Sequence, residues 1–384
     1  MILGLLPSIR GGLGELAKTG QHSRLIDGYL RPYARAFEEV RYFSYLRESL
    51  LDYTDDTELA AKVRLFPGGS WHPWLYAFVM PFRYRRQLSG CAVLRVFQVT
   101  GVIPAVLAKR LFGVPFVTTY GFWYSTLAHS PASRWLRRWV ERVGLAMADG
   151  VIVTTPELGA YVAGKVEGAK VHLIPNGVDT RRFAPSPLSS PPRGRGKGEG
   201  GPARRVLYVG RLSPEKNLGT LISAVGQLLG RLPLRLTFIG DGPAREALEA
   251  RARELRVPVD FLPFVDHGRL PDFFREADAF VLPSFTEGHP KVLLEAMSCG
   301  VPCVASARGG NLDIVADGKT GLLFDPENAG ELAECLERVL TQPGLARLLA
   351  EAARAMVVER YDLGALVSRE IDLLKRVAHG KPCA

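Results

Sequence analysis

The chain has 384 residues, of which 47% are hydrophobic and 23% charged, so it has enough apolar material for two folded domains of ordinary size. Its formal net charge of +10 favours anionic partners such as nucleotide diphosphates, nucleic acid or acidic lipids. The five cysteines are odd in number and include no C-x-x-C pair. This argues against a disulfide framework or a cysteine metal site and favours a reducing compartment.

The first segment predicts a buried strand at Ile2–Leu6, because residues 1–7 are too short for a signal peptide and lack its cationic start. A glycine-rich turn over residues 10–14 follows this strand. Glycine lets a backbone approach a ligand closely, so Gly11 and Gly12 are candidate ligand contacts.

Residues 12–19 also resemble a P-loop, which would make the protein a nucleotide triphosphatase. Ala17 stands where that motif requires glycine, and no convincing strand with a partner aspartate follows. The Gly-Lys-Thr run at 318–320 fails as well, since Asp313 occupies the position of its first glycine. The P-loop interpretation is therefore disfavoured.

Residues 56–58, Asp-Thr-Glu, are the nearest match to the D-x-D motif with which metal-dependent transferases hold a cation on a diphosphate. They lie in a polar segment away from the other candidate residues. The sequence therefore predicts no metal site.

An aromatic segment, Trp71–Phe82, runs directly into the cationic residues 83–86. It is too short to span a bilayer, and no apolar run in the chain reaches the roughly 18 residues required. Aromatic side chains beside cations suit an interfacial membrane contact. A buried helix with a solvated basic end is the alternative.

Strand-like and helical patterns alternate through the first half of the chain. Strands are expected at Ile2–Leu6, Ala92–Gln98, Phe116–Tyr120, Gly150–Thr154 and Lys170–Ile174, with helices at Ile103–Leu111 and Arg134–Ala148. Tyr120 closes one of these strands, where its hydroxyl could hydrogen-bond a substrate, although it cannot act as a base at neutral pH as His can. A buried aromatic residue is the alternative.

Residues 185–204 are rich in Pro, Gly and Arg and offer almost nothing to bury. They predict a flexible linker between an N-terminal domain, residues 1–184, and a second domain, residues 205–360. One short Arg/Gly run is weak support for RNA binding.

The second half repeats the alternation. Strands are expected at Arg205–Val209, Arg235–Ile239, Val259–Leu262, Ala279–Leu282 and Pro302–Ala305, with helices at Leu218–Leu229, Ala244–Leu255 and Leu270–Glu276. Alternation of this kind implies parallel sheets covered by helices, with ligands beyond the carboxyl ends of the strands. Residues 361–384 then predict an amphipathic helical tail.

Two cations follow the first strand of the second domain. Arg211 presents a planar fork of donors and Lys216 a flexible point charge, and both suit phosphate oxygens. Taken alone they could equally be solvated loop residues.

The segment from Glu287 to Pro302 is the most informative in the chain. Pro290 suits a first helical position, and residues 291–299 predict a short buried helix. The amide groups at its start form an anion site, flanked by Glu287 and Glu295. The alternative is an ordinary ion pair between Glu295 and the lysine four residues before it.

Residues 287–302, the Gly-Arg-Leu…Lys segment at 210–216 and the turn at 241–243 together resemble the donor-site signature of the retaining nucleotide-sugar glycosyltransferases named GT4. Asn217, Tyr120 and residues 311–312 depart from that pattern, since relatives often carry Gly, His and Pro-Glu there. The resemblance implies the GT-B fold, an α/β architecture of two Rossmann-like parallel-sheet domains facing a central cleft. It also implies that the tail helix packs back toward the first domain.

The resemblance further assigns roles. Glu295 is expected to accept from the ribose hydroxyls, and Glu287 from sugar hydroxyls near C3 and C4. The remaining donor contacts are expected to neutralise the diphosphate: Arg211, Lys216, Gly11, Gly12, Gly288, His289, Lys291 and Val292.

The expected reaction is transfer of a sugar from a nucleotide-diphosphate sugar, with retention and without metal or cofactor, to a glycan, lipid-linked or small-molecule acceptor. A cytoplasmic location is expected, with a peripheral contact to anionic membrane left open and no nucleic-acid partner. The alternatives are an epimerase or phosphorylase on the same scaffold, or a non-enzymatic basic protein that binds nucleic acid or membrane. The donor base, the sugar, the acceptor and the oligomeric state stay open.

Overall fold

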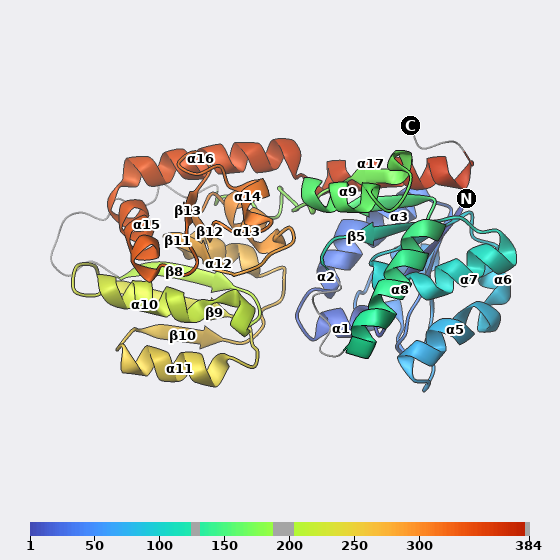
Figure 1. Cartoon of the computed structure of the whole chain (residues 1–384), viewed down its shortest axis with the longest axis horizontal. Coiled ribbons are helices and arrows are strands. Elements are labelled where there is room, and N and C mark those ends of the chain that lie inside the picture. Colours follow the sequence, from blue (N-terminus) through green and yellow to red (C-terminus); the bar gives the residue numbers. More distant parts are fainter. Residues whose placement is uncertain (124–130, 187–202, 381–384) are drawn as a thin grey trace. The chain divides into compact units, whose positions relative to one another are not determined.

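The computed structural model describes residues 1–123, 131–186 and 203–380, so most of the predicted linker lies outside the described residues. The chain divides into two compact units. The first contains residues 1–175 together with the tail from Gly364, and the second contains Asn176–Leu363 (Figure 1). Each unit is built around one parallel sheet.

The sheet of the first unit has the order β3-β2-β1-β4-β5-β6-β7. Its strands are β1 Ile2–Leu6, β2 Glu39–Phe43, β3 Val63–Phe66, β4 Val93–Val96, β5 Phe116–Tyr120, β6 Gly150–Val153 and β7 Val171–Leu173. All pairs are parallel. Strands β1 and β6 read as continuous apolar runs, as expected of strands whose two faces are covered by helices.

The helices of the first unit are α1 Leu13–Ala17, α2 His22–Leu25, α3 Arg31–Ala36, α4 Thr57–Lys62, α5 Pro73–Arg83, α6 Arg85–Ser89, α7 Val102–Phe112, α8 Pro131–Met147, α9 Pro156–Ala163 and α17 Leu363–Ala378. Single turns of other helix types occur at Ile26–Leu30, Leu50–Asp52, Val99–Gly101 and Gly168–Lys170. Helix α7 packs against both α5 and α8, so these three helices form one layer (Figure 1).

The sheet of the second unit has the order β10-β9-β8-β11-β12-β13, again with parallel pairs only. Its strands are β8 Arg204–Val209, β9 Leu234–Ile239, β10 Val259–Leu262, β11 Ala279–Leu282, β12 Cys303–Ser306 and β13 Leu322–Phe324. Its helices are α10 Leu218–Leu228, α11 Arg245–Glu254, α12 Leu270–Glu276, α13 Lys291–Ser298, α14 Asn311–Ile314, α15 Ala329–Thr341 and α16 Pro343–Arg360, with a 3-10 turn at Pro214–Lys216.

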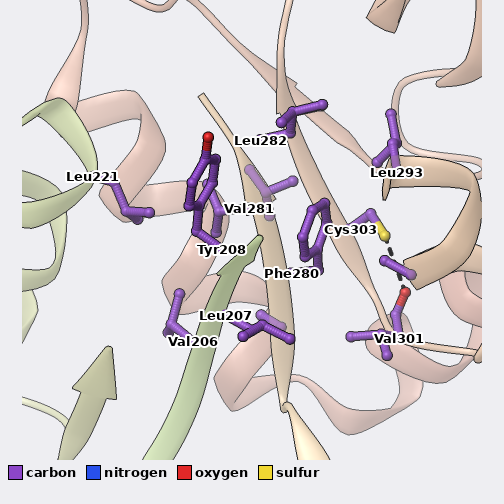
Figure 2. Close-up of a cluster of buried hydrophobic side chains, with 14 of the residues drawn as sticks. Val206, Leu207, Tyr208, Leu221, Phe280, Val281, Leu282, Leu293, Val301 and Cys303 are labelled. Atoms are coloured by element: carbon purple, nitrogen blue, oxygen red, sulfur yellow. Dashed lines mark hydrogen bonds between the residues drawn. The ribbon is translucent and has the colours of Figure 1, made fainter. Parts of the chain in front are cut away.

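The core of the second unit lies between its sheet and the helices that cover it. Figure 2 shows Tyr208 of β8, Phe280 of β11 and Leu293 of α13 within this cluster, all of them buried. The Cys303 thiol donates to the Val301 carbonyl at 3.2 Å, so this sulfur has a partner inside the core. This packing fixes the strand ends, from which the candidate site is built.

The first unit ends at Pro175, not at residue 184 as the sequence predicts. Val178 forms a bridge with Asp362, and Phe183 is fully buried in the second core. The run Pro-Asn-Gly at 175–177 reads as a turn closing the first domain, but the residues after it bury apolar surface against the second sheet.

The tail helix α17 belongs to the first unit. Glu370 of this helix accepts from Arg95 of β4, with Nε–Oε1 at 2.6 Å and Nη2–Oε2 at 3.1 Å. The hydroxyl of Tyr33 donates to the same carboxylate. All three side chains are buried, so a fully satisfied polar cluster fastens α17 to the sheet.

Three features differ from the sequence predictions. Strands β2, β3 and β13 were not expected. Pro290 has φ −73° and ψ 110°, so it is the N-cap residue and the helix begins at Lys291. The extended ψ of Pro290 turns the chain out of the preceding loop before the helix starts.

Candidate donor site

The candidate site residues of the second unit gather at the carboxyl edge of its sheet. They come from the loops after β8, β10, β11 and β12 and from the start of α13. Parallel strands end on the same edge, which is where ligands bind in sheets of this type.

Lys216 and Glu287 lie together at the centre of this edge. The Lys216 Nζ contacts Glu287 Oε1 at 2.7 Å, and the Ser284 hydroxyl donates to the same oxygen at 2.6 Å. The side chains of Lys216 and Glu287 are 22% and 12% exposed. The structure thus pairs a predicted phosphate contact with a predicted sugar contact, both reachable from solvent.

Asn217 holds the loop that carries Lys216. Its backbone is left-handed, with φ 54° and ψ 37°, a conformation open to Gly and to Asn at low cost. Its side-chain amide donates to the carbonyls of Pro283 at 3.1 Å and Pro326 at 2.7 Å. Asparagine therefore adopts here a left-handed conformation that glycine also adopts readily, and it ties this loop to the segment before Glu287.

The glycine pair Gly309–Gly310 fixes the backbone of the loop that carries Glu287. The Gly310 amide donates to the Glu287 carbonyl at 3.0 Å. A Cβ at Gly310 would lie 1.6 Å from the Gly288 carbonyl oxygen, and Gly309 has φ +50°. Only glycine permits this backbone approach, so the loop after β12 sets the position of Glu287.

Glu295 is almost fully buried on α13 and lies beside a histidine that the sequence did not single out. The His267 Nε2 and Glu295 Oε1 are 3.0 Å apart, and both side chains are at most 6% exposed. His267 stands in the loop after β10, so the rule that ligands meet strand ends could have identified it.

His289 faces the protein interior. Burial, with a smaller effect of the Lys291 charge, lowers the pKa of its imidazole to about 4. Its ring lies 5.3 Å from that of Tyr361, and its carbonyl accepts from the Asn176 amide at 2.7 Å. If residue 289 contacts the sugar donor, its backbone therefore makes the contact.

Arg211 is exposed at the same edge, and its carbonyl accepts from the Tyr208 hydroxyl at 3.0 Å. Gly288 precedes α13, whose first turn contains Lys291 and Val292. The first turn of a helix has no intrahelical acceptors for its amide groups and carries a partial positive charge. This edge therefore combines cationic side chains with a helix start that favours anions.

In the first unit, the glycine-rich loop already holds an anion of its own. Glu48 accepts from the amides of Leu13 at 3.0 Å and Gly14 at 2.8 Å. A Cβ at Gly12 would lie 2.6 Å from this carboxylate, and the Gly11 carbonyl accepts from the Tyr45 amide at 3.1 Å. The sequence analysis did not identify Glu48, because it follows β2, a strand that was not predicted.

Tyr120 is fully buried at the end of β5 and stacks on Tyr161, with ring centroids 5.6 Å apart. Burial raises the pKa of its hydroxyl, with a smaller contribution from Glu141. These properties match the alternative interpretation of a core aromatic residue.

The D-x-D-like segment has a local structural role. The Asp56 carboxylate accepts from the Leu59 amide at 2.9 Å as the N-cap of α4, and it also pairs with Arg31. Within residues 1–123, 131–186 and 203–380, no group of three or more His, Cys, Asp or Glu side chains could hold a metal ion. Metal independence stays a prediction.

Helix α5 contains most of the aromatic segment and divides its apolar side chains between two faces. Tyr76, Ala77 and Met80 are buried. The exposed apolar side chains are Trp71 at 51%, Leu75 at 50%, Phe78 at 45% and Phe82 at 63%. None of the described helices combines the length and apolar character needed to cross a bilayer.

Two family models match the chain in succession. Residues 23–182 match Glycosyltransferase Family 4, and residues 195–356 match Glycosyl transferases group 1. The chain belongs to the GT4 glycosyltransferases. The GT4 resemblance of the Glu287–Pro302 segment is thereby confirmed.

Among curated proteins, this GT4 member is 36% identical over 264 residues to D-inositol 3-phosphate glycosyltransferase of Actinosynnema mirum. The match covers 64% of this chain and 63% of that protein, so the chain spans less than two thirds of its relative's length.

Solved structures confirm the predicted GT-B fold. Sucrose-phosphate synthase from Thermosynechococcus elongatus superposes with a TM-score of 0.80 at 24% identity, over 99% of this chain and 100% of that one. Anabaena HepE in complex with UDP and glucose gives 0.75 at 18% identity, over 97% and 99%.

Proposed function

We propose that this chain transfers a sugar from a nucleotide-diphosphate sugar to an acceptor, with the donor held mainly by the second unit. The observation that carries the proposal is the Lys216–Glu287 contact beside the start of α13. A cation, a carboxylate and a helix start within one small region suit a phosphate group joined to a polyhydroxylated sugar.

Each group then has a distinct task. Lys216, Arg211 and the amides at the start of α13 neutralise the diphosphate, whose negative charge grows as the sugar leaves. Glu287 accepts from sugar hydroxyls near C3 and C4, and Glu295 from the ribose. His267, at 3.0 Å, orients the Glu295 carboxylate for that contact.

The matched proteins support this donor class. The HepE crystal structure contains UDP and glucose. The relative from Actinosynnema mirum is named D-inositol 3-phosphate glycosyltransferase. A thermal-shift screen across UDP-, GDP-, ADP- and TDP-sugars tests the proposal, because ligand binding raises the melting temperature by mass action. A chain that no nucleotide sugar stabilises is not a nucleotide-sugar transferase.

We further propose a retaining reaction that needs neither metal nor cofactor. The cations and the helix start can stabilise the leaving diphosphate without a bound ion. Turnover is expected to persist in excess EDTA, and the product is expected to keep the anomeric configuration of the donor. An inverted product, or complete loss of turnover in EDTA that Mg²⁺ restores, contradicts this part.

We also propose a cytoplasmic protein whose first unit touches anionic membrane through α5. The exposed apolar side chains of this helix are followed by Arg83, Arg85 and Arg86, which suit acidic headgroups. Helix α8 adds two exposed tryptophans, Trp135 at 67% and Trp139 at 47%. The free thiols of four described cysteines support a reducing compartment.

Co-sedimentation with phosphatidylglycerol vesicles tests the membrane contact. A Phe78→Ser/Phe82→Ser double variant is expected to lose most of the binding. Leu348→Ser is the matched control, since Leu348 is an equally exposed apolar residue of α16 in the second unit (63%). Equal binding by all three proteins, or by none of them, contradicts the contact.

A further inference from the structure

An open pocket of about 750 Å³ lies in the first unit. One of its lining residues, Glu48, also accepts hydrogen bonds from the loop that carries Gly11 and Gly12. Its walls are the loop after β2 and the loop after β3, together with the end of α5. The polar and aromatic lining consists of Arg47, Glu48, Ser70, Trp71, His72 and Arg83. Both loops leave the carboxyl ends of parallel strands, the edge at which such sheets bind ligands.

The backbone of this pocket is fixed by contacts between its loops. The Gly68 amide donates to the Leu46 carbonyl at 2.7 Å, and a Cβ at Gly68 would lie 2.2 Å from the Tyr45 carbonyl oxygen. Because only glycine allows this approach, the loops after β2 and β3 are locked together. Ligand sites are usually formed in advance in this way.

The charge of the pocket is unbalanced toward positive. Glu48 accepts from the amides of Leu13 and Gly14 and from the hydroxyls of Ser44 and Tyr53, so internal donors satisfy its carboxylate.

Arg47 and Arg83 have no carboxylate partner in the part of the chain that the structure describes. Arg47 donates to the Ser70 hydroxyl at 2.8 Å, and the Arg83 guanidinium lies 5.4 Å from the Tyr84 ring centroid. Two guanidinium groups at one pocket suit a phosphate, which they can bind through paired hydrogen bonds.

Trp71 gives the same pocket a flat apolar wall. Half of its side chain is exposed (51%), and it lies in the loop after β3, two residues before α5 begins. A ligand that fits this wall has an apolar or ring face next to its anionic group, the usual combination of shape and a few polar anchors.

We propose that this pocket is the acceptor subsite and that it binds an acceptor bearing a phosphate group. Arg47 and Arg83 hold the phosphate, and Trp71 packs on the adjoining ring or chain. This inference rests on the proposed transferase function. Two sources carry the same chemistry, a soluble sugar phosphate and the headgroup of a phospholipid.

Titration followed by tryptophan fluorescence tests the proposal, with and without the best-binding nucleotide. The probes are a hexose 6-phosphate, the neutral hexose, and vesicles of phosphatidylglycerol or phosphatidylcholine. Arg47→Ala and Arg83→Ala are each expected to weaken binding of the anionic probe about tenfold or more. Arg110→Ala, an exposed arginine of α7 outside both the pocket and the α5 surface, is the matched control and is expected to bind as the parent does.

Two further variants separate binding from folding. Arg83→Lys is expected to restore part of the affinity through its charge, and Trp71→Phe to keep the affinity while reducing the fluorescence change. Binding of the hexose phosphate identifies a soluble acceptor. Binding of phosphatidylglycerol alone, weakened by Arg47→Ala, identifies a lipid headgroup in the pocket. The proposal is overturned if the neutral hexose binds as tightly as its phosphate, if no anionic probe binds, or if the alanine variants bind normally.

Failure of the donor proposal gives a different result. A chain that binds the anionic probe through Arg47 and Arg83 but binds no nucleotide sugar refutes the transferase function and leaves the anion pocket. A chain that binds nucleotide sugars but no anionic probe refutes the pocket alone.

Discussion

The two units share parallel sheets and loops at one edge, but they treat charge at that edge differently. In the second unit, the carboxylates at this edge have side-chain partners, Lys216 for Glu287 and the imidazole of His267 for Glu295. In the first unit, the Glu48 carboxylate accepts hydrogen bonds from backbone amides and hydroxyls, and Arg47 and Arg83 line an open pocket. A matched edge suits a ligand with both hydroxyls and phosphate, whereas a cationic pocket suits an anion.

The largest expected effect removes the anchor of the tail in the first unit. Glu370→Ala leaves Arg95, which is 4% exposed, without its carboxylate, and such a loss costs about 3–5 kcal/mol. A urea titration measures this loss of stability as a shift of the unfolding midpoint to a lower urea concentration. Glu351→Ala, on the exposed pair with Arg347, is the control and is expected to stay within about 0.5 kcal/mol of the parent. Similar costs for both variants contradict the buried anchor.

The next effect depends on pH and belongs to the second unit. Folding keeps His289 neutral down to about pH 4, while the unfolded chain takes up the proton near pH 6.5. Stability is therefore lost as pH falls from 6.5 toward 4, by about 3 kcal/mol. His289→Asn is expected to lack this part of the slope in melting temperature against pH. Parallel pH profiles for the two proteins mean that the imidazole is not the cause.

A smaller structural change tests how the Glu287 loop is held. Gly310→Ala forces the Gly288 carbonyl away, at a cost of about 1–3 kcal/mol, and is expected to weaken binding of the nucleotide sugar as well. Isothermal titration at a temperature where the variant is folded measures the second effect. Unchanged affinity for the nucleotide sugar at that temperature would mean that the position of this loop does not determine donor binding.

The smallest effect is the control for that substitution. Gly219 lies in α10 with no atom within 4 Å of an added Cβ. Gly219→Ala is expected to stabilise the chain by about 0.5–1 kcal/mol and to leave donor binding unchanged. A destabilised variant here shows that glycine-to-alanine changes in this unit are costly for reasons other than contact.

Much of the donor site was predictable because its signature is local. Glu287 and Glu295 stand on one loop and one helix, and Arg211 and Lys216 on one loop, so short stretches of sequence carry the resemblance to GT4 relatives that suggested their donor roles. The partners were not predictable, since Lys216 and Glu287 are 71 residues apart and only the sheet order brings them together.

The first unit was harder to predict for a physical reason. Strands β2 and β3 carry Arg41 and Arg64 because they lie at or near the sheet edge, where one face is partly solvated. The charged residues interrupt the apolar pattern of these two short strands, whereas β1 and β6 are apolar throughout. The loops after these strands carry Arg47, Glu48 and Trp71. Because the strands were not predicted, the pocket that their loops form was not predicted either.

In the proposed donor complex, Glu287 binds the sugar, while Lys216 and Arg211 bind the diphosphate. Isothermal titration of a nucleotide sugar and of its parent nucleotide diphosphate tests this directly, with Glu287→Gln and the exposed control Glu327→Gln. The parent and the control are expected to prefer the nucleotide sugar by about tenfold, as a charge-assisted hydrogen bond provides. Glu287→Gln is expected to bind both ligands equally. A Glu287→Gln protein that keeps the full preference for the sugar would contradict the account.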